Sequence, residues 1–539
     1  MTYGSNGSVI GPENTPTSSS APGVWSLGEI AESLRDSAWP APDAITMMGF
    51  FKPDTSVFGT GTYGSVVLDT DSSGNLFAMF PAQSSGNNYI VEVNKTTKAI
   101  DSIRNYTQAD GVALYLSVMG ISKSTDVMYL GGTAQTGPGS NNNALMARLT
   151  ESGSAGYDTF SWSYDWMGGS MGGWPFNYNN VYFTSGVKNQ RIQIDDTNGV
   201  VYAGGKWWTS NSYGRLLAIG TAATYANHGY AYWGSAYGSY SAYVLSVIGS
   251  KSSTSGKAYC LVGDDGDPNK YVSLQQLTRS TSSDSDGDRA SPSPTGVGRD
   301  ILRKEGRVQA CCDSMDTSEN IYIASADPGT SQVFYLTKYT ATTHQWTVQI
   351  TTPWANAYPN SSGPVLDASG NVYCAWYVPG GSASNSGGIY VGKWDSSGSQ
   401  QWLNLLEFND ANQTDNNHTF YSCDIKLGTT DSADDSLWIS SGQMYWGSGT
   451  TGYSDEKMIC RLRSDGGGLG TYNFSMTGKQ GGALSISYTA SGLTTSSYSS
   501  SSASADPPEL NFGASYGNAQ TVNGTDAQVT SGTTWETNP

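Results

Sequence analysis

The stretch PVLDASGNVYCA, residues 364–375, is the part of the sequence that decides the fold. Apolar residues precede and follow a short tract of Asp, Ser, Gly and Asn, the residues that favour a tight turn. Two short apolar strands joined by such a turn form an antiparallel hairpin. The same order of residues recurs in VVLDTDSSGNLFA at 66–78 and in QIDDTNGVVYAG at 193–204. The chain therefore contains an internal repeat.

Shorter copies of this pattern occur at 124–131, 257–260, 316–323 and 434–439. Each of the seven copies has an aromatic residue at the same position of its second strand; these are Phe77, Tyr129, Tyr202, Tyr259, Tyr322, Tyr373 and Trp438. Consecutive aromatics lie between 51 and 73 residues apart, as the differences of their numbers show. This period is much longer than one hairpin, so each unit must contain further strands.

Six of the units continue with a second apolar stretch, at 89–95, 144–149, 216–220, 333–339, 388–395 and 457–463. A Trp often follows in a fourth segment, as at Trp162, Trp346 and Trp402. Four short strands repeated at this period are typical of a β-propeller blade, which buries its two faces against its neighbours. The sequence predicts an all-β, seven-bladed β-propeller; a β-sandwich and a β-helix are the alternatives.

These units resemble the Gly-Asn-Val-Tyr type of β-propeller repeat over about residues 60–465. The best match consists of Asp367, Gly370, Asn371 and Tyr373, followed by Lys393, Asp395, Gly398 and Trp402. The resemblance implies a fold and leaves the function open.

The composition excludes several classes of protein. Charged residues make up 13% of the chain, and the formal net charge is −18. So few Lys and Arg residues argue against binding of nucleic acid. No apolar run has the length of a membrane span, and the polar N-terminus does not predict a secretion signal. The six Cys residues have no metal-binding spacing, and we expect them to be reduced and buried.

One short helix is predicted, within GVWSLGEIAESLRDSAWP at 23–40. Ser26 and Glu29 form a capping box at its start, and Pro40 marks its end. Its apolar residues are predicted to dock the chain onto another protein; they are Trp25, Leu27, Ile30, Leu34 and Trp39.

The N-terminal segment carries a second resemblance. The phrase GSVIGPENTPT at 7–17, followed by GVWSLGEIAE at 23–32, is similar to a leader found on tail and appendage proteins of marine tailed bacteriophages. This resemblance implies a virion protein that is assembled in the host cytoplasm, with other virion proteins and copies of itself as partners. We therefore expect a docking segment at 1–50, a propeller at 51–480 and a Ser/Thr/Gly-rich C-terminal extension at 481–539. The extension is interpreted as a linker, or as a segment ordered along a neighbouring subunit.

No catalytic motif stands out. His228, His344 and His418 are isolated in the sequence, and no metalloprotease, nucleophile-elbow or phosphate-loop motif is present. Asp284, Asp286 and Asp288 have the spacing of a calcium loop, but Arg289 and Thr295 replace the Gly and Glu that such a loop needs. We expect no enzyme activity, no cofactor and no metal site.

Aromatic residues are the strongest candidates for binding. Two polar segments are crowded with them, and their rings can contact sugars or proteins through an apolar face and a polar edge. The candidate residues are Trp162, Trp166, Trp174, Tyr178, Tyr232, Trp233 and Tyr237. Packing of these segments on the propeller is the alternative interpretation.

The sequence thus predicts a structural protein of a bacteriophage virion, in the tail or a tail appendage. The propeller would contact other subunits or a glycan or protein of the host surface, without inserting into a membrane. A propeller hydrolase that acts on host polysaccharide and a capsid decoration protein are the alternatives. The hydrolase would require a pair of carboxylates placed for acid–base work.

Overall fold

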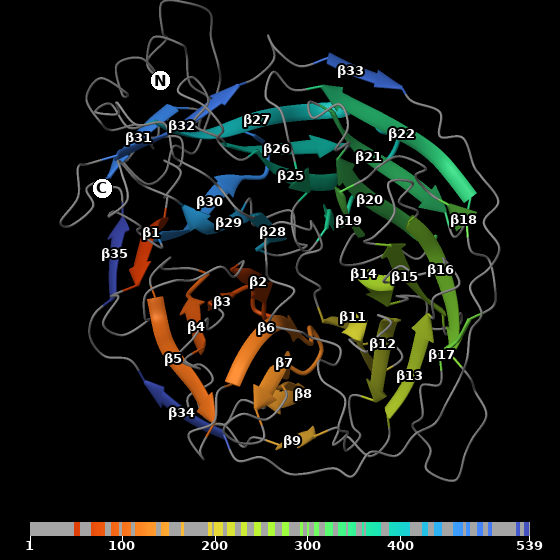
Figure 1. Cartoon of the computed structure of the whole chain (residues 1–539). Helices are drawn as coiled ribbons and strands as arrows, with labels where there is room; N and C mark the ends of the chain where they lie inside the picture. Colours follow the sequence, from red (N-terminus) through yellow and green to blue (C-terminus); the bar gives the residue numbers. More distant parts are fainter. Residues whose placement is uncertain are drawn as a thin grey trace, which may run out of the picture. The chain divides into compact units, whose positions relative to one another are not determined.

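The computed structural model shows an all-β protein in its described part (Figure 1). The structure describes residues 48–53, 66–80, 88–95, 100–108, 114–135, 142–149, 163–166, 192–196, 199–207, 213–220, 228–233, 242–249, 257–264, 272–279, 292–294, 299–300, 307–311, 318–326, 333–340, 343–351, 358–359, 363–378, 388–409, 423–428, 436–444, 456–466, 470–474, 482–488, 494–497, 524–528 and 533–537. No helix occurs in these residues, and their strands form seven antiparallel sheets.

The first three sheets follow the chain from its N-terminal half. The first contains β2 (Val67–Thr70), β3 (Leu76–Phe80), β4 (Asn88–Val93), β5 (Ile100–Gln108) and, at its edge, β34 (Gly524–Gln528). The second contains β6 (Leu114–Ile121), β7 (Met128–Gln135), β8 (Asn142–Leu149) and β9 (Ser163–Trp166). The third contains β10 (Gln193–Asp195), β11 (Val200–Trp207), β12 (Tyr213–Gly220) and β13 (His228–Trp233).

The remaining four sheets have the same core of successive antiparallel strands. The fourth contains β14 (Ala242–Gly249), β15 (Lys257–Asp264), β16 (Val272–Arg279), β17 (Pro292–Pro294) and β18 (Arg299–Asp300). The fifth contains β19 (Arg307–Cys311), β20 (Asn320–Ala326), β21 (Val333–Thr340), β22 (Thr343–Thr351) and β33 (Thr494–Ser497). The sixth contains β23 (Tyr358–Pro359), β24 (Val365–Leu366), β25 (Val372–Val378), β26 (Gly388–Trp394), β27 (Gln400–Asn409), β31 (Gly470–Phe474) and β32 (Gly482–Tyr488). The seventh contains β28 (Cys423–Leu427), β29 (Ser436–Met444), β30 (Glu456–Arg463), β1 (Met48–Pro53) and β35 (Thr533–Thr537).

The aligned aromatic residues occupy one position in each sheet. All seven are buried, with exposed fractions between 0 and 3%, and each lies in a strand that follows the predicted turn: β3, β7, β11, β15, β20, β25 or β29. The six predicted second stretches form β4, β8, β12, β21, β26 and β30. In the fourth sheet the corresponding strand is β16, which the sequence reading missed because VSLQQLTR is only partly apolar.

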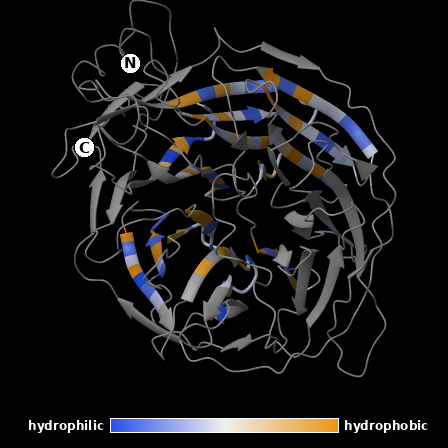
Figure 2. Ribbon diagram, viewed as in Figure 1, coloured by the Kyte–Doolittle hydropathy of each residue, from blue (hydrophilic) through white to orange (hydrophobic). Residues whose placement is uncertain are grey.

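The first sheet shows why its strands are apolar on both sides. Val67, Phe77 and Met79 belong to a core that this sheet shares with the second sheet. The residues that alternate with them, such as Leu68 and Ala78, belong to a core that includes Trp438 of the seventh sheet. Successive side chains of a strand point to opposite faces, so both faces are buried between neighbouring sheets. At the outer strands β5 and β22 hydrophobic and hydrophilic residues are interspersed instead (Figure 2).

Each sheet contacts two other sheets through its innermost strands. The contacts run from β2 to β6, from β6 to β10, from β10 and β11 to β14, and from β14 to β19. They continue from β19 to β23, from β24 and β25 to β28, and from β28 to β2. The series therefore leads from the first sheet through the seventh and back to the first.

Strands from both ends of the chain complete these sheets. β1 pairs with β30, so the seventh sheet takes its fourth strand from the N-terminal side. β32, β33, β34 and β35 pair with β27, β22, β5 and β1, respectively. The composition of 481–539 predicts a linker or an arm along another subunit. The described strands of this flank instead pair with sheets of their own chain.

The chain divides into two compact units, Met1–Met47 and Met48–Pro539. The predicted helix within 23–40 and its docking residues Trp25, Leu27, Ile30, Leu34 and Trp39 lie outside the described residues. Among the residues that the structure describes, no helix is long and apolar enough to cross a membrane.

Candidate functional site

The turn between the first two strands of a sheet has a recurring backbone feature. The residue three positions before the aligned aromatic has a positive φ, of 89° at Gly74, 54° at Asp126, 63° at Gly199, 59° at Glu319 and 79° at Gly370. Glycine adopts this conformation without cost, whereas other residues lose about 1–2 kcal/mol. Asp126 and Glu319 therefore occupy strained positions that three other repeats give to glycine.

The Asp–Gly–Asn part of the repeat closes the turn. In the first sheet the carboxylate of Asp71 accepts hydrogen bonds from the backbone N–H and from the side-chain amide of Asn75, both at 2.8 Å. Asp367 and Asn371 make the same two contacts at 2.8 Å in the sixth sheet. Burial raises the pKa of Asp71, and the nearby Asp126 adds to this shift, while the bonds from Asn75 oppose it. These Asp residues thus hold a local turn.

A second group of carboxylates joins one sheet to the next. Asp69 lies on β2, and its Oδ2 accepts a bond of 2.7 Å from the backbone N–H of Ile121 in the second sheet. Asp424 lies on β28, and its Oδ2 accepts a bond of 2.9 Å from the backbone N–H of Leu68 in the first sheet. The other oxygen of each carboxylate accepts the N–H of the following residue, Thr70 or Ile425. Both Asp residues are buried, and the same joint therefore occurs at two sheet boundaries.

The strained Asp126 makes another joint at the turns. Its carboxylate accepts the backbone N–H and the hydroxyl of Ser72 in the preceding sheet, both at 2.7 Å. One boundary further, Asp196 accepts the backbone N–H of Lys123 at 2.8 Å and the hydroxyl of Ser124 at 3.0 Å. A carboxylate in one turn thus holds the turn of the preceding sheet.

Glu319, the other strained residue, also reaches the preceding sheet. Its Oε2 accepts the hydroxyl of the buried Tyr259 at 2.6 Å. Burial of the Tyr259 hydroxyl raises its pKa, and the hydrogen bond to Glu319 and the negative charge of that residue act in the same direction. In the part of the chain that the structure describes, both non-glycine residues with positive φ therefore contribute a bond between sheets, which offsets the cost of their backbone conformation.

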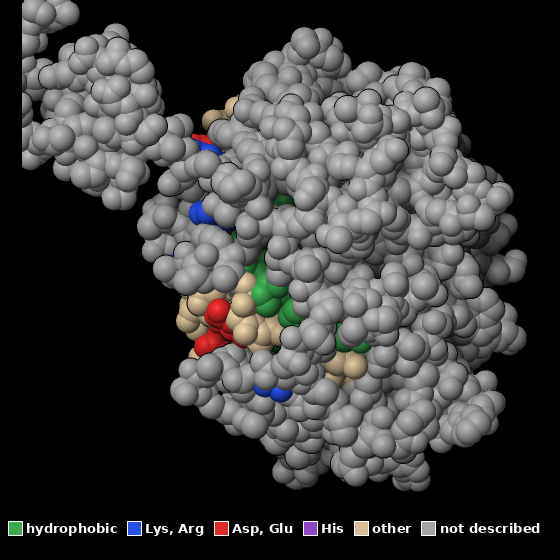
Figure 3. Space-filling model, turned by 90° about the vertical axis from the view of Figure 1, so that its left-hand side faces the viewer, with side chains coloured by type: hydrophobic (Ala, Val, Ile, Leu, Met, Phe, Trp, Pro, Cys, Tyr) green, Lys and Arg blue, Asp and Glu red, His purple; other side chains and the backbone are tan. Residues whose placement is uncertain are grey.

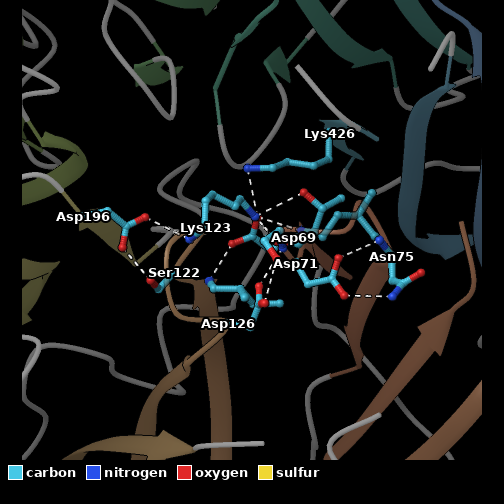
Figure 4. A network of polar contacts seen from close by, with 12 residues as sticks. Asp69, Asp71, Asn75, Ser122, Lys123, Asp126, Asp196 and Lys426 are labelled. Carbon is cyan, nitrogen blue, oxygen red and sulfur yellow. Dashed lines mark hydrogen bonds and ion pairs between the residues drawn. The ribbon is translucent and has the colours of Figure 1, made fainter. Parts of the chain in front are cut away.

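Two lysines complete the polar cluster around Asp69 (Figure 4). The ammonium groups of Lys123 and Lys426 lie 2.9 and 3.0 Å from Asp69 Oδ1. Lys426 comes from the seventh sheet and Lys123 follows β6 of the second, so Asp69 connects three sheets. The side chains of Lys426 and Asp69 are 12% and 6% exposed, whereas that of Lys123 is 42% exposed. Lys123 also donates to the backbone oxygen of Thr70.

The later turns join the sheets through tryptophan. Trp346 of β22 donates its indole N–H to the Ser396 carbonyl at 3.2 Å, and Trp402 of β27 donates to the Ser464 carbonyl at 3.1 Å. Each indole lies against a turn glycine, Gly398 or Gly466. The expected fourth-strand Trp thus contacts the next sheet in both described cases.

The chemistry of these contacts is structural. The carboxylates of Asp69, Asp126, Asp196 and Asp424 accept backbone or hydroxyl hydrogen bonds that cross between sheets. His344 is partly buried, which lowers its pKa, and its Nε2 lies 2.9 Å from the Thr347 hydroxyl. In the described part of the chain no three His, Cys, Asp or Glu side chains are placed to hold a metal ion. The face in Figure 3 shows a group of acidic side chains, with hydrophobic side chains close by.

Most of the predicted binding residues are not among the residues that the structure describes. Trp162, Trp174, Tyr178 and Tyr237 lie outside the described residues, as do Asp284, Asp286 and Asp288. Trp166 is the last residue of β9, and Trp233 is the last residue of β13 after Tyr232. These two Trp therefore end the fourth strands of two sheets that contact each other. The structure does not describe their side chains.

The residues that join the sheets could not be predicted from the sequence pattern, with two exceptions. Asp69 and Asp424 lie in apolar strands, and a single Asp at a strand end gives no signal of its own. Asp126 and Glu319 could have been found, because they stand where other repeats have Gly74, Gly199 or Gly370. A charged residue at a position that favours glycine indicates a compensating contact.

The chain matches no protein-family model and no curated protein. Among solved structures, it is similar to one from a "Structural and Mechanistic Analysis of Two Prolyl Endopeptidases: Role of Inter-Domain Dynamics in Catalysis and Specificity". The identity is 9% and the TM-score is 0.34; the match covers 80% of this chain and 55% of that one. A likeness of this degree carries no argument about fold or activity.

Proposed function

We propose that this protein is a structural component of a bacteriophage virion, built as a seven-bladed β-propeller and docked through its N-terminal segment. The seven sheets are the blades. Two findings support this arrangement: the series of sheet contacts returns to its start, and β1 supplies the fourth strand of the seventh sheet. An aligned, buried aromatic in each sheet supports it further.

The contacts between sheets favour a scaffold over an enzyme. Asp69 and Asp424 are buried acceptors of backbone N–H groups in a neighbouring sheet. A general acid or base must instead offer its carboxylate to a substrate. The proposal of a non-enzymatic protein rests on this structural observation, that buried carboxylates bind neighbouring sheets to one another. The tail or tail-appendage location rests on the leader phrase in residues 1–47.

Aromatic residues provide the binding surface of the propeller. Trp166 and Trp233 end the fourth strands of neighbouring blades, next to the segments that hold Trp174 and Tyr237. With a net charge of −18, the chain should gain no long-range attraction to an anionic cell surface. Contact with a host glycan or with another virion subunit therefore depends on apolar and hydrogen-bonding groups.

Incorporation of tagged variants into particles tests the docking proposal. Cells that express full-length protein, a variant lacking residues 2–45, or the variant Leu27→Ala/Ile30→Ala/Leu34→Ala are infected, and purified particles are probed for the tag. We expect only the full-length protein in particles, with all three proteins soluble and folded. The deletion stops before Met48 because β1 belongs to the seventh sheet. Normal incorporation of both variants would contradict docking through this segment.

A second test concerns the binding surface. The variant Trp166→Ala/Trp174→Ala/Trp233→Ala/Tyr237→Ala should remain folded and lose affinity for its host-surface or virion partner. Each buried anchor should contribute about 1–3 kcal/mol. Trp346→Phe is the matched control. It removes an indole that donates to the Ser396 carbonyl and that lies outside the proposed binding surface. Release of sugars from host polysaccharide by the purified wild-type protein would favour the hydrolase alternative instead.

A further inference from the structure

The C-terminal strands cover the outer edges of sheets that are far apart in sequence. β32 pairs with the outer strand of the sixth sheet and β33 with that of the fifth. β34 pairs with the outer strand of the first sheet. An outer edge presents backbone groups that would otherwise pair with water or with another chain. These C-terminal strands therefore act as edge covers.

β35 has a different partner. It pairs with β1, which pairs on its other side with β30. The first described strand of the chain is thus held between β30 and the last. The register joins Phe50 to Met458 on the β30 side, and Lys52 to Thr534 on the β35 side. β1 in turn directly follows the unit Met1–Met47.

We propose that β35 is a clamp that keeps β1 paired with β30 and so keeps the ring of sheets closed. Without β35, β1 is a six-residue edge strand, and edge strands open more readily than interior ones. This inference rests on the proposed function, because a docked N-terminal unit would pull on β1, the strand that closes the ring of sheets. Force on a docked N-terminal unit reaches the propeller at β1, the strand that β35 retains.

Hydrogen exchange of the full-length protein tests the clamp. In the variant Thr534→Pro/Trp535→Pro, at least one N–H that points toward β1 is removed, because donors alternate along an antiparallel strand. The matched control is Thr495→Pro/Ser496→Pro in β33, which pairs with β22. We expect exchange about tenfold faster in β1 and β30 for the β35 variant, which corresponds to about 1.4 kcal/mol. The control should show faster exchange in β22 only.

A disulfide gives an independent measurement. Lys52 and Thr534 are register partners, and such partners lie within the distance that a disulfide spans. Oxidised Lys52→Cys/Thr534→Cys should exchange about tenfold more slowly in β30 than the same variant after reduction. The clamp is contradicted if β30 exchanges in the proline variant as fast as in the wild type and equally fast in the oxidised and reduced disulfide variant. This conclusion would hold even if the full-length protein is found in particles. Altered exchange with no protein in particles would support the clamp and contradict the virion proposal.

Discussion

Replacing Asp69 by Ala should destabilise the protein strongly, because one carboxylate serves three sheets. Its loss leaves the buried N–H of Ile121 without the acceptor that lies 2.7 Å away in the wild type. An unsatisfied buried donor costs about 1–3 kcal/mol. It also removes an ion pair with Lys426, whose side chain is only 12% exposed. Breaking a buried ion pair from one side costs about 3–5 kcal/mol, and the two effects overlap.

We therefore expect the free energy of unfolding to fall by about 3–5 kcal/mol. Unfolding entropy is about 2 cal/mol/K per residue, so the unit Met48–Pro539 has about 1 kcal/mol/K. The expected decrease in Tm is about 3–5 °C, measured by differential scanning calorimetry. Asp101→Ala is the control, because Asp101 is exposed and accepts one bond of 2.8 Å from Asn94. Its effect should stay within about 0.5 kcal/mol.

A double variant separates the two contributions. Asp69→Asn can still accept the Ile121 N–H, but it removes the negative charge that lies 3.0 Å from the ammonium of Lys426. Adding Lys426→Met removes that ammonium and should recover about 1–2 kcal/mol of the loss. The ion-pair reasoning is refuted if the double variant is no more stable than Asp69→Asn alone, or if Asp69→Ala melts like the Asp101 control.

Two further substitution experiments and one labelling experiment follow from the turns and the thiols. Asp126→Gly should be less destabilising than Asp126→Ala by about 1–2 kcal/mol, since glycine tolerates the φ of 54°; equal unfolding energies would contradict this. Gly466→Ala should cost about 2 kcal/mol more than Gly370→Ala, because both glycines have positive φ, but only at Gly466 would a methyl group lie 2.6 Å from Trp402; equal melting temperatures would exclude the steric cost. Cys374, Cys423 and Cys460 form no disulfide and are buried, and burial raises the pKa of each thiol, to about 12 for Cys460. A raised pKa keeps a thiol protonated at about pH 8, so peptide mapping after treatment with a thiol reagent should find these three labelled only once the protein unfolds; their labelling in the native protein would contradict that burial.

The repeat could be read from the sequence because each repeated antiparallel sheet requires particular residues at its turn and in its buried strands. A tight turn requires glycine or asparagine, and a strand buried on both faces requires consecutive apolar residues, so 364–375 and 66–78 carry clear signals. The seven aligned aromatics located the second strand of every sheet. These features act over a few residues, which is the range that a sequence pattern reports.

Contacts between distant residues could not be read in this way. Asp424 and Leu68 are 356 residues apart, and nothing near either residue indicates that they meet. The C-terminal flank misled the sequence reading for a related reason. Ser- and Thr-rich strands such as β33 add to a sheet through backbone hydrogen bonds, so they need no apolar pattern of their own.

Electron cryo-microscopy of purified phage particles tests the central proposal most directly. The virion proposal predicts density for a ring of seven four-stranded blades at the tail or its appendages, with residues 1–47 contacting a neighbouring virion protein. Density at the capsid surface would support the decoration alternative. Particles that lack the protein altogether would contradict a structural role in the virion.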